Sequence, residues 1–280
     1  MGIKIFDAFS FFNELDLLEI RLNELSDVVD KFVLVEADRT HAGRFKPLYF
    51  EMNKTRFTKF FDKIIHIVVI NMPMTPEEIQ AAISPQDRHW LDTGYQLGDN
   101  WVRERFQRNA MMIALIDCDP NDIIIIEDAD EMVRAEIIAN LDATMCDGSN
   151  AVMQTMHTYF INWECKNMPW AGTKILRRKF VDNPSEHRFH TPASCFIHDG
   201  GWHFNFLGGY SAIKRKLAAY AHQEFNTNAV LDNIDKLMYD QKDLLGRSYE
   251  YDIVPIDESY PKYLQENIHR FPNLVYKDYR

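Results

Sequence analysis

Acidic residues gather in the middle of the chain, and their spacing could bind a cation. The segment at residues 127–131 reads EDADE and follows four consecutive isoleucines at 123–126. Alternate side chains of an extended segment point the same way, so Asp128 and Asp130 can face one ion together. Carboxylate oxygens suit hard cations such as Mn²⁺ or Mg²⁺, which bridge to phosphate oxygens and neutralise a departing nucleoside diphosphate. The pattern therefore predicts a metal site on Asp128 and Asp130, with Asp128 also beside the diphosphate.

Two other interpretations of this segment stay open. A solvated acidic turn that caps the next helix would carry no chemistry. A metal-dependent phosphohydrolase could use Asp128 as its nucleophile, but such enzymes usually place the aspartate pair after their first strand, with Thr or Val soon after. Here the pair lies far into the chain, and Glu131 and Met132 follow it. That placement favours a transferase.

The elements that must position this segment alternate along residues 1–131. Short apolar runs typical of strands covered on both faces lie at 4–9, 32–36, 63–70 and 123–126. Apolar residues at three- and four-residue spacing predict helices at 15–29 and 101–117. Such alternation predicts an α/β fold with a mostly parallel central sheet, at whose carboxyl edge ligands bind. The acidic segment lies at such an edge.

The second half of the chain is less regular. Expected elements are helices near 135–143 and 211–222, strands at 151–163 and 173–180, and a Gly-rich aromatic segment at 199–210. The stretch from Pro73 to Asn100 is rich in proline and polar residues and is predicted to be a loop. No internal repeat or low-complexity segment divides the sequence, so one domain over residues 1–280 is expected.

Charge and cysteine content exclude several classes of protein. The net charge of −11 argues against binding nucleic acid over a broad surface, because phosphate contacts need clustered Lys and Arg. The four cysteines lack CxxC spacing, so neither a zinc site nor a dense disulfide framework is expected, and a reducing compartment suits them. No run approaches the roughly 20 apolar residues of a membrane helix, and the N-terminus lacks the pattern of a signal peptide. These features predict a cytoplasmic protein without a membrane span.

Short blocks across residues 3–225 follow one another in an order typical of one family. They are KIFDAF at 4–9 with Asn13-Glu14, Val35-Glu36-Ala37 with Arg39-Thr40, Lys46-Pro47-Leu48, Arg103-Glu104-Arg105, Asp128-Ala129-Asp130-Glu131 and Gly201-Trp202-His203. Together they resemble glycosyltransferase family 17, the β-1,4-mannosyl-glycoprotein β-1,4-N-acetylglucosaminyltransferases, and suggest a microbial or viral member. The resemblance implies a GT-A (Rossmann-like) fold, a UDP-GlcNAc donor, a divalent metal (usually Mn²⁺) and inversion at the anomeric carbon.

The resemblance also implies a division of labour within the single domain. Residues 1–131 would bind the nucleotide sugar, and residues 132–280 would bind the acceptor glycan and supply the C-terminal helices. Animal members of the family carry a membrane anchor and stem that this sequence lacks, which leaves the acceptor open.

The same resemblance suggests roles for residues outside the acidic segment. His203 would complete the metal ligands, although a histidine in that context can also be a half-buried strand residue. Glu36 and Thr40 end an early strand, where GT-A folds bind base and ribose; a capped turn is the alternative. Arg105 and Arg108, near a helix start, could reach the pyrophosphate with bidentate geometry or could be solvated helix residues.

Aromatic and basic residues give weaker signals. Trp163, Trp170 and Trp202 could stack on sugar rings, because aromatic faces match the apolar faces of pyranoses, although core packing is the commoner fate of a Trp. Trp170 and Trp202, each beside or near glycine, are the better candidates, and Trp202 is assigned to the donor site. The basic run at residues 214–216 is expected to form a solvated helix face.

An inverting transfer also needs a general base for the acceptor hydroxyl. Asp199 is the first candidate, because it adjoins the Gly201-Trp202-His203 block, and Glu164 and Glu224 are others. Glu131, with Glu127, is expected to support the catalytic centre. A glycan-binding protein on a decayed transferase scaffold is a further alternative, against which the intact acidic segment argues.

Overall fold

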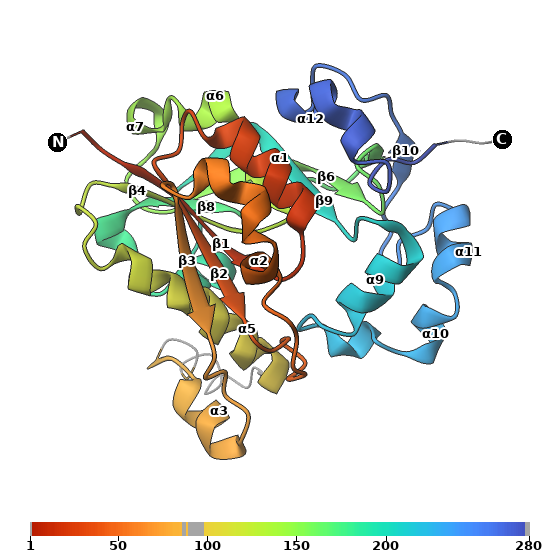
Figure 1. The fold of residues 1–280 in the computed structure, drawn as a ribbon, viewed down its shortest axis with the longest axis horizontal. Helices are drawn as coiled ribbons and strands as arrows, with labels where there is room; N and C mark the ends of the chain where they lie inside the picture. Colours follow the sequence, from red (N-terminus) through yellow and green to blue (C-terminus); the bar gives the residue numbers. More distant parts are fainter. Residues whose placement is uncertain (1, 86–87, 89–97, 278–280) are drawn as a thin grey trace.

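The computed structural model describes residues 2–85, 88 and 98–277, and one twisted sheet forms its centre (Figure 1). Ten strands of the described residues join this sheet, eight of them in the order β10-β7-β6-β8-β4-β1-β2-β3, with β9 on β6 and β5 on β9. The strands are β1 (Ile5–Phe11), β2 (Lys31–Ala37), β3 (Ile64–Val69), β4 (Ile123–Asp128), β5 (Glu131–Val133), β6 (Asn150–Thr158), β7 (Trp163–Cys165), β8 (Lys174–Arg177), β9 (Cys195–Asn205) and β10 (Tyr251–Ile253).

The N-terminal part of the sheet is parallel and carries the acidic segment on its central strand. β1 pairs with β2 and β4, and β2 pairs with β3, all in parallel. The isoleucines of β4 are fully buried, and alternate ones pack into opposite apolar cores, Ile123 and Ile125 in one and Ile124 and Ile126 in the other. A strand covered on both faces must be apolar throughout, which explains the run of isoleucines.

The C-terminal part of the sheet brings β9 to the acidic segment. β8 pairs antiparallel with β4, and β6 pairs antiparallel with β8 and parallel with β9. β5 then pairs antiparallel with β9 and sets Glu131 opposite His203. The predicted α/β class with a parallel central sheet is confirmed, and the antiparallel additions after Glu131 account for the less regular sequence pattern there.

Helices cover both faces of the sheet. On one face lie α1 (Leu15–Leu25) and α12 (Lys262–Asn267), and on the other α5 (Asp99–Asn109) with the short η2 (Ala110–Leu115). The remaining helices are α2 (Tyr49–Asn53), η1 (Lys54–Phe60), α3 (Pro76–Ala82), α6 (Ala135–Ile138), α7 (Leu141–Thr144), η3 (Arg178–Phe180), α8 (Pro184–Phe189), α9 (Gly209–Leu217), η4 (Gln223–Phe225), α10 (Asn228–Leu231), α11 (Ile234–Tyr239) and η5 (Ile268–Arg270). Figure 1 shows α9, α10 and α11 gathered at one side, where they pack on a smaller apolar core.

Several predicted elements differ in extent. The strand expected at 173–180 ends with β8, and η3 follows it, while the helix expected at 135–143 is split into α6 and α7. The loop predicted up to Asn100 contains α3, which a capping box between Thr75 and Glu78 begins. Residues 86–87 and 89–97 of that predicted loop lie outside the described residues. The division of labour at residue 131 stays a prediction.

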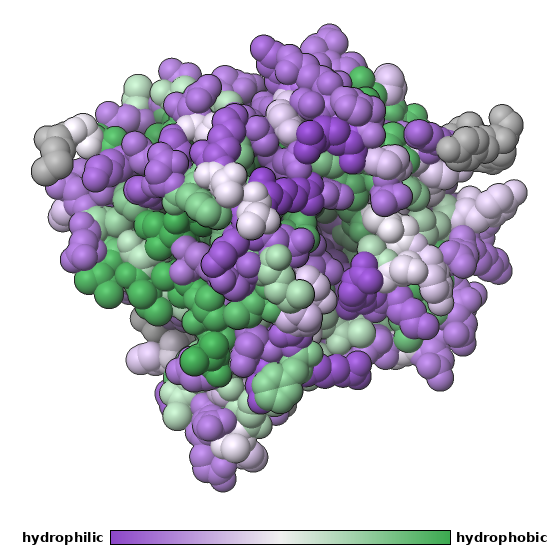
Figure 2. All heavy atoms as spheres, viewed as in Figure 1, coloured by the Kyte–Doolittle hydropathy of each residue, from purple (hydrophilic) through white to green (hydrophobic). Residues whose placement is uncertain are grey.

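The surface in Figure 2 is mostly hydrophilic, with an apolar area over the edge strand β3 and the helical segment after α5. Exposed apolar side chains of these elements include Val68, on β3, and Ile113, on η2. Among the described residues no helix combines the length and the apolar composition that crossing a bilayer requires.

One disulfide joins Cys146 to Cys195. It links the segment before β6 to the first residue of β9, and these two strands pair in parallel with Asn150 opposite Cys195. Cys118 and Cys165 are free. One bridge agrees with the expectation that the chain has no dense disulfide framework. It does not match the reducing compartment that the cysteine spacing suggested. Spacing along the chain could not reveal which cysteines the sheet brings together.

Candidate active site

A cavity of about 460 Å³ opens at the carboxyl ends of β1 and β4. Its wall combines the loops after β1 and β2, the helices α5, α8 and α9, the acidic segment and β9. Of the residues that were interpreted individually from the sequence, those on this wall are Thr40, Arg108, Asp128, Asp130, Trp170, His203 and Lys216. Glu14, Arg39, Lys46 and Glu104, named there only within the family blocks, also line it. The parallel topology explains the location, because the strand ends and their loops converge at this edge.

The backbone of the acidic segment rests on a buried arginine. Arg21 of α1 has a side chain 1% exposed, and its Nη1 donates to Asp7 at 2.8 and 2.9 Å and also to Glu127. Its Nη2 donates to the carbonyl oxygens of Asp128, at 3.1 Å, and of Glu131. Burial alone would lower the pKa of Arg21, but the carboxylates of Asp7 and Glu127 raise it above its ordinary value.

Arg21 was not among the residues expected at the site. The available signal was a charged residue on the leucine-rich face of α1, between Leu18 and Leu22, where the helix packs on the sheet. Charges on such a face are almost never fully buried unless they are paired.

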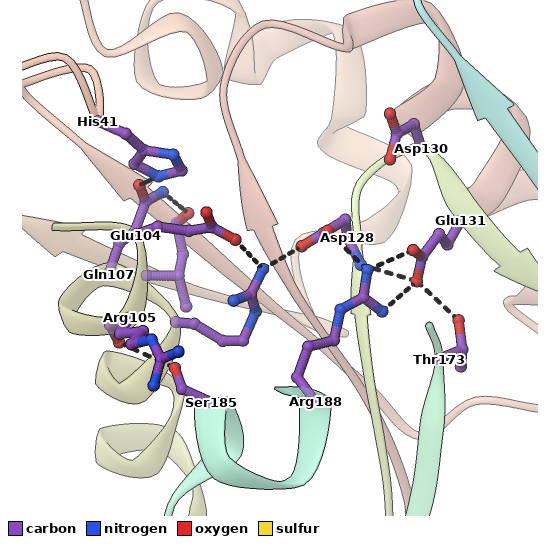
Figure 3. A network of polar contacts seen from close by, with 12 residues as sticks. His41, Glu104, Arg105, Gln107, Asp128, Asp130, Glu131, Thr173, Ser185 and Arg188 are labelled. Carbon is purple, nitrogen blue, oxygen red and sulfur yellow. Dashed lines mark hydrogen bonds and ion pairs between the residues drawn. The ribbon is translucent and has the colours of Figure 1, made fainter. Parts of the chain in front are cut away.

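Two arginines hold the Asp128 carboxylate. Arg108 Nη2 donates to Asp128 Oδ1 and Arg188 Nη2 donates to Asp128 Oδ2, each at 2.8 Å. Arg188 also donates to Glu131, so that its guanidinium lies between the two acidic side chains (Figure 3). Burial would raise the pKa of Asp128, but Arg188 and Arg108 hold it well below its usual range. Asp128 is therefore a carboxylate at any physiological pH.

Glu131 points away from the cavity into a polar network. Its Oε2 accepts a hydrogen bond from Thr173 Oγ1 at 2.8 Å (Figure 3). Its Oε1 accepts one from the indole of Trp170. With Arg188 on both oxygens, the side chain is fully buried. The structure thus gives Glu131 contacts of a supporting residue, and it places Trp170 on the cavity wall.

Asp130 lies beside His203 and Lys216 on one wall of the cavity. Asp130 Oδ1 lies 3.7 Å from His203 Nε2, and Lys216 Nζ lies 2.5 Å from Asp130 Oδ2. Burial would raise the pKa of Asp130, but Lys216 and His203 lower it, while burial lowers the pKa of His203. His203 Nδ1 is buried without a hydrogen-bond partner among the described residues. The site thus pairs a charged carboxylate with a neutral imidazole.

Lys216 is another residue at the site that was not expected there. The basic run of α9 was expected on a solvated face, but the Lys216 ammonium reaches Asp130 and lies 3.3 Å from Asn205 Oδ1. The signal was its position three residues after the buried Ile213, on the same side of the helix.

The described side chains fit a divalent cation in part. No group of three or more His, Cys, Asp or Glu side chains that could hold a metal ion occurs in residues 2–85, 88 and 98–277. Asp130 and His203 offer an oxygen and a nitrogen donor on one wall, too far apart at 3.7 Å to hydrogen-bond. The Asp128 oxygens are engaged by Arg108 and Arg188 instead. The predicted set of three ligands is therefore brought to one cavity but not assembled around one point.

Thr40 and Glu36 separate in the structure. Thr40 lines the cavity, where its Oγ1 accepts a hydrogen bond from Arg44 N at 3.1 Å. Glu36 is fully buried outside the cavity and accepts a hydrogen bond from the backbone of Phe50 at 3.0 Å, at the start of α2. Its contacts are those of a structural cap, the alternative that the sequence left open for this residue.

Arg105 and Trp202 also lie outside the cavity wall. The Arg105 guanidinium is 4.9 Å from the ring centroid of Phe189, and its Nη2 is 3.2 Å from His190 Nε2. Burial lowers the pKa of Arg105 to about 10. Trp202 is 3% exposed in the main apolar core, and its indole donates to Ser259 O at 3.0 Å. Trp163 likewise packs in a core.

The expected base candidates lie outside the cavity as well. The Asp199 side chain is 80% exposed and pairs with Arg134 at 2.9 Å, and Glu164 and Glu224 are absent from the described cavity wall. Asp199 was predicted to be the base because it adjoins the Gly201-Trp202-His203 block. That prediction does not match its position, because β9 runs away from the cavity at this end, where Gly201 pairs with Val133.

Two carboxylates that the sequence did not assign do line the cavity. Glu14 Oε2 accepts hydrogen bonds from Phe12 N and Asn13 N at 2.9 Å, and burial raises its pKa. Glu104 pairs with Arg108 at 2.9 Å. Both belong to blocks that carried the family resemblance, which was the signal available for them.

Comparison with known proteins gives a consistent result. Residues 2–275 match the sequence model of Glycosyltransferase family 17. The enzymes named Beta-1,4-mannosyl-glycoprotein 4-beta-N-acetylglucosaminyltransferase from Rattus norvegicus and Homo sapiens are both 24% identical over 319 residues, which is 99% of this chain and 55% and 56% of theirs. The chain spans about half the length of the curated relatives it matches. Among solved structures, HddC from Yersinia pseudotuberculosis is similar with a TM-score of 0.36 and 10% identity, over 74% of this chain and 90% of that one.

The family match includes the acidic segment, the loops after β1 and β2, and all of β9. It confirms the resemblance carried by the ordered blocks, and together with the sheet topology it confirms the predicted α/β fold of GT-A type. The family match favours the transferase interpretation over the phosphohydrolase and the glycan-binding alternatives. The chain belongs to glycosyltransferase family 17.

Proposed function

We propose that this chain transfers N-acetylglucosamine from UDP-GlcNAc to a glycan hydroxyl, with inversion at the anomeric carbon and with a divalent metal, Mn²⁺ or Mg²⁺. The donor is inferred from the name of the relatives, which are N-acetylglucosaminyltransferases. The observation that carries the proposal is the charge pattern of the cavity. Arg108, Arg188 and Lys216 meet Asp128 and Asp130 on one wall, so the site can bind a cation and an anion side by side.

The metal would be held by Asp130 and His203, joined by Asp128 once the donor diphosphate draws Arg108 and Arg188 toward its own oxygens. When bound, it would neutralise negative charge on the leaving diphosphate. Guanidinium groups suit phosphate oxygens because they donate two parallel hydrogen bonds. Arg108 and Arg188 would therefore orient the diphosphate, and Lys216 would balance its charge.

The nucleoside would lie against the loops after β1 and β2, where Thr40 lines the wall. The general base must reach the acceptor hydroxyl inside the cavity, within about 3 Å or through one water. Glu14 and Glu104 therefore replace Asp199 as candidates for this role. The chain's own side chains would therefore hold the donor, orient the acceptor and accept one proton from the acceptor hydroxyl.

The test is donor binding and turnover by the wild-type chain. Incubation with UDP-GlcNAc and Mn²⁺ is expected to release UDP slowly even without acceptor, and calorimetry is expected to show metal-dependent binding. Asp130→Asn should abolish metal-dependent donor binding and leave thermal unfolding unchanged. Asp199→Asn, at an exposed position outside the cavity, is the matched control and should behave as wild type.

Two results would contradict the proposal in different ways. Absence of UDP-sugar binding by the wild type, with or without metal, would remove the transferase assignment. Full activity of Asp130→Asn would leave the transferase assignment in place and would remove the metal site.

A further inference from the structure

Three aromatic side chains from distant segments meet on the cavity wall. Trp101 comes from the first turn of α5, Phe189 from the last residue of α8, and His222 from the segment after α9. The Trp101 ring centroid is 6.0 Å from that of Phe189 and 4.5 Å from that of His222, in both cases with the rings nearly perpendicular. We call these three residues the aromatic platform.

The aromatic platform is not part of an apolar core. Phe189 is 37% exposed, and Trp101 and His222 are half-buried. The apolar clusters formed by the described residues contain none of the three. Burying an aromatic ring stabilises a protein, so rings left open on a cavity wall favour a role in binding. Their contacts with one another fix the ring orientations before any ligand enters.

The platform adjoins the charged centre of the cavity. The Arg108 guanidinium lies 5.0 Å from the ring centroid of Phe189 and donates to Asp128 at 2.8 Å. Arg188, the neighbour of Phe189 in sequence, holds the other oxygen of Asp128. A ring resting on Phe189 would therefore lie directly beside the groups proposed to hold the donor diphosphate. This is where a second substrate must sit for group transfer.

The chemistry of the platform suits a sugar ring. A pyranose has one face of C–H groups and a rim of hydroxyls, so it needs an aromatic surface with polar groups around it. Glu104 and Arg247 line the same cavity and can pair with hydroxyls.

We propose that Trp101 and Phe189 form the acceptor subsite, in which one ring stacks on the apolar face of an acceptor pyranose and the other, nearly perpendicular to it, borders the edge of the sugar. This inference rests on the proposed transferase function and adds to it the residues that select the acceptor. Trp170, the tryptophan that the sequence favoured for sugar stacking, is committed through its indole to Glu131 and through its ring to His203 at 4.7 Å. It lies on the donor side of the cavity.

The experiment separates acceptor binding from donor binding. Trp101→Ala, Phe189→Ala and the double variant are compared with the conservative variants Trp101→Phe and Phe189→Tyr. The probe is a glycopeptide whose glycan carries a β-1,4-linked mannose, the acceptor indicated by the relatives' name. KM is measured for this acceptor and for UDP-GlcNAc, together with UDP release without acceptor.

Each alanine variant is expected to raise the acceptor KM about tenfold, in line with the value of one aromatic contact. For Trp101→Ala the donor KM and acceptor-free UDP release should stay within about twofold of wild type. Phe189→Ala also removes the ring against which Arg108 packs at 5.0 Å, so for this position the comparison uses Phe189→Tyr, which keeps that contact. The conservative variants should recover most of the loss of acceptor binding. An unchanged acceptor KM, or a glycopeptide that wild type modifies no faster than the double alanine variant, would overturn the subsite. Continued UDP release by the wild type in those cases would leave the transferase function standing.

Discussion

The guanidinium of Arg21 donates a hydrogen bond of 3.1 Å to the carbonyl oxygen of Asp128. This contact joins a helix on one face of the sheet to the last residue of β4, at the point where the strand enters the cavity. Arg21 also donates a hydrogen bond to the carbonyl oxygen of Glu131. It therefore contacts the backbone at both ends of the turn formed by Asp128 to Glu131. Replacing a buried ion cluster by apolar residues is often neutral or stabilising, so stability alone does not explain its presence.

The first prediction follows from that geometry. Arg21→Met should destabilise the fold by about 3–5 kcal/mol, because it leaves the buried carboxylates of Asp7 and Glu127 without a counterion. The triple variant Arg21→Met/Asp7→Asn/Glu127→Gln should regain much of this free energy of unfolding in urea titrations. Its affinity for UDP and Mn²⁺ should nevertheless stay reduced, because nothing holds the turn. Recovery of donor affinity together with stability would show that Arg21 has no positioning role.

The second prediction concerns Lys216, whose ammonium lies 2.5 Å from Asp130. Lys216→Met should change two affinities in opposite directions. Mn²⁺ alone should bind more tightly, since Asp130 loses a competing cation, while UDP should bind more weakly because a positive charge is lost. Calorimetric titration of each ligand separately measures both. Lys214→Met, on the same helix but outside the cavity wall, is the control, and a parallel change in both affinities for Lys216→Met would contradict the proposed role.

The third prediction concerns the disulfide. Cys146 and Cys195 close a loop of 49 residues, for which the chain-entropy model gives a stabilisation of about 4 kcal/mol. The double variant Cys146→Ser/Cys195→Ser should lose about this much free energy of unfolding. The wild type in dithiothreitol should unfold at the same urea concentration as the double variant. Cys118→Ser, at a free cysteine, is the control and should keep both the wild-type stability and the wild-type dependence on the reductant, because it retains the bridge. If mass spectrometry under non-reducing conditions finds four free thiols, the bridge is absent in solution.

The fold was largely accessible from the sequence because its central strands carry strong local patterns. The consecutive isoleucines of β4 reflect a strand that is buried on both faces. The leucines of α1, at three- and four-residue spacing, reflect a helix that is buried on one face. The predicted bounds were wrong where short elements follow one another, as with α6 and α7. A helix of one turn leaves little periodicity in the sequence.

The candidate site was only partly accessible, for a different physical reason. Asp130 and His203 lie close together because β5 pairs with β9, and Asp128 reaches the same cavity without joining them around one point. The ordered family blocks pointed to these three residues. Lys216 and Arg188 come from short helices whose direction depends on tertiary packing. Their local sequence shows at most the side of the helix, as the spacing of Lys216 from Ile213 does, and not the cavity that they line. Asp199 was chosen for nearness in sequence, but in a strand four residues separate side chains by roughly 13 Å.

The last prediction concerns His157, a histidine buried in β6 against the rings of Phe204 and Tyr260, each 5.3 Å away. Burial lowers the pKa of His157 to about 3, with a smaller contribution in the same direction from the charge of Arg134. Below the ordinary histidine pKa of about 6.5, the unfolded chain therefore takes up a proton that the folded chain refuses, and stability falls as the pH falls.

Between pH 7 and pH 5 this group should cost the wild type roughly 2 kcal/mol of unfolding free energy, since each pH unit below the unfolded pKa contributes about 1.4 kcal/mol. His157→Phe should remove that part of the pH dependence, because phenylalanine fits the same aromatic surroundings and binds no proton. Urea unfolding at the two pH values measures the difference. His198→Gln, at an exposed position, should keep the wild-type dependence, and an equal loss of stability in His157→Phe and wild type would show that His157 does not carry it.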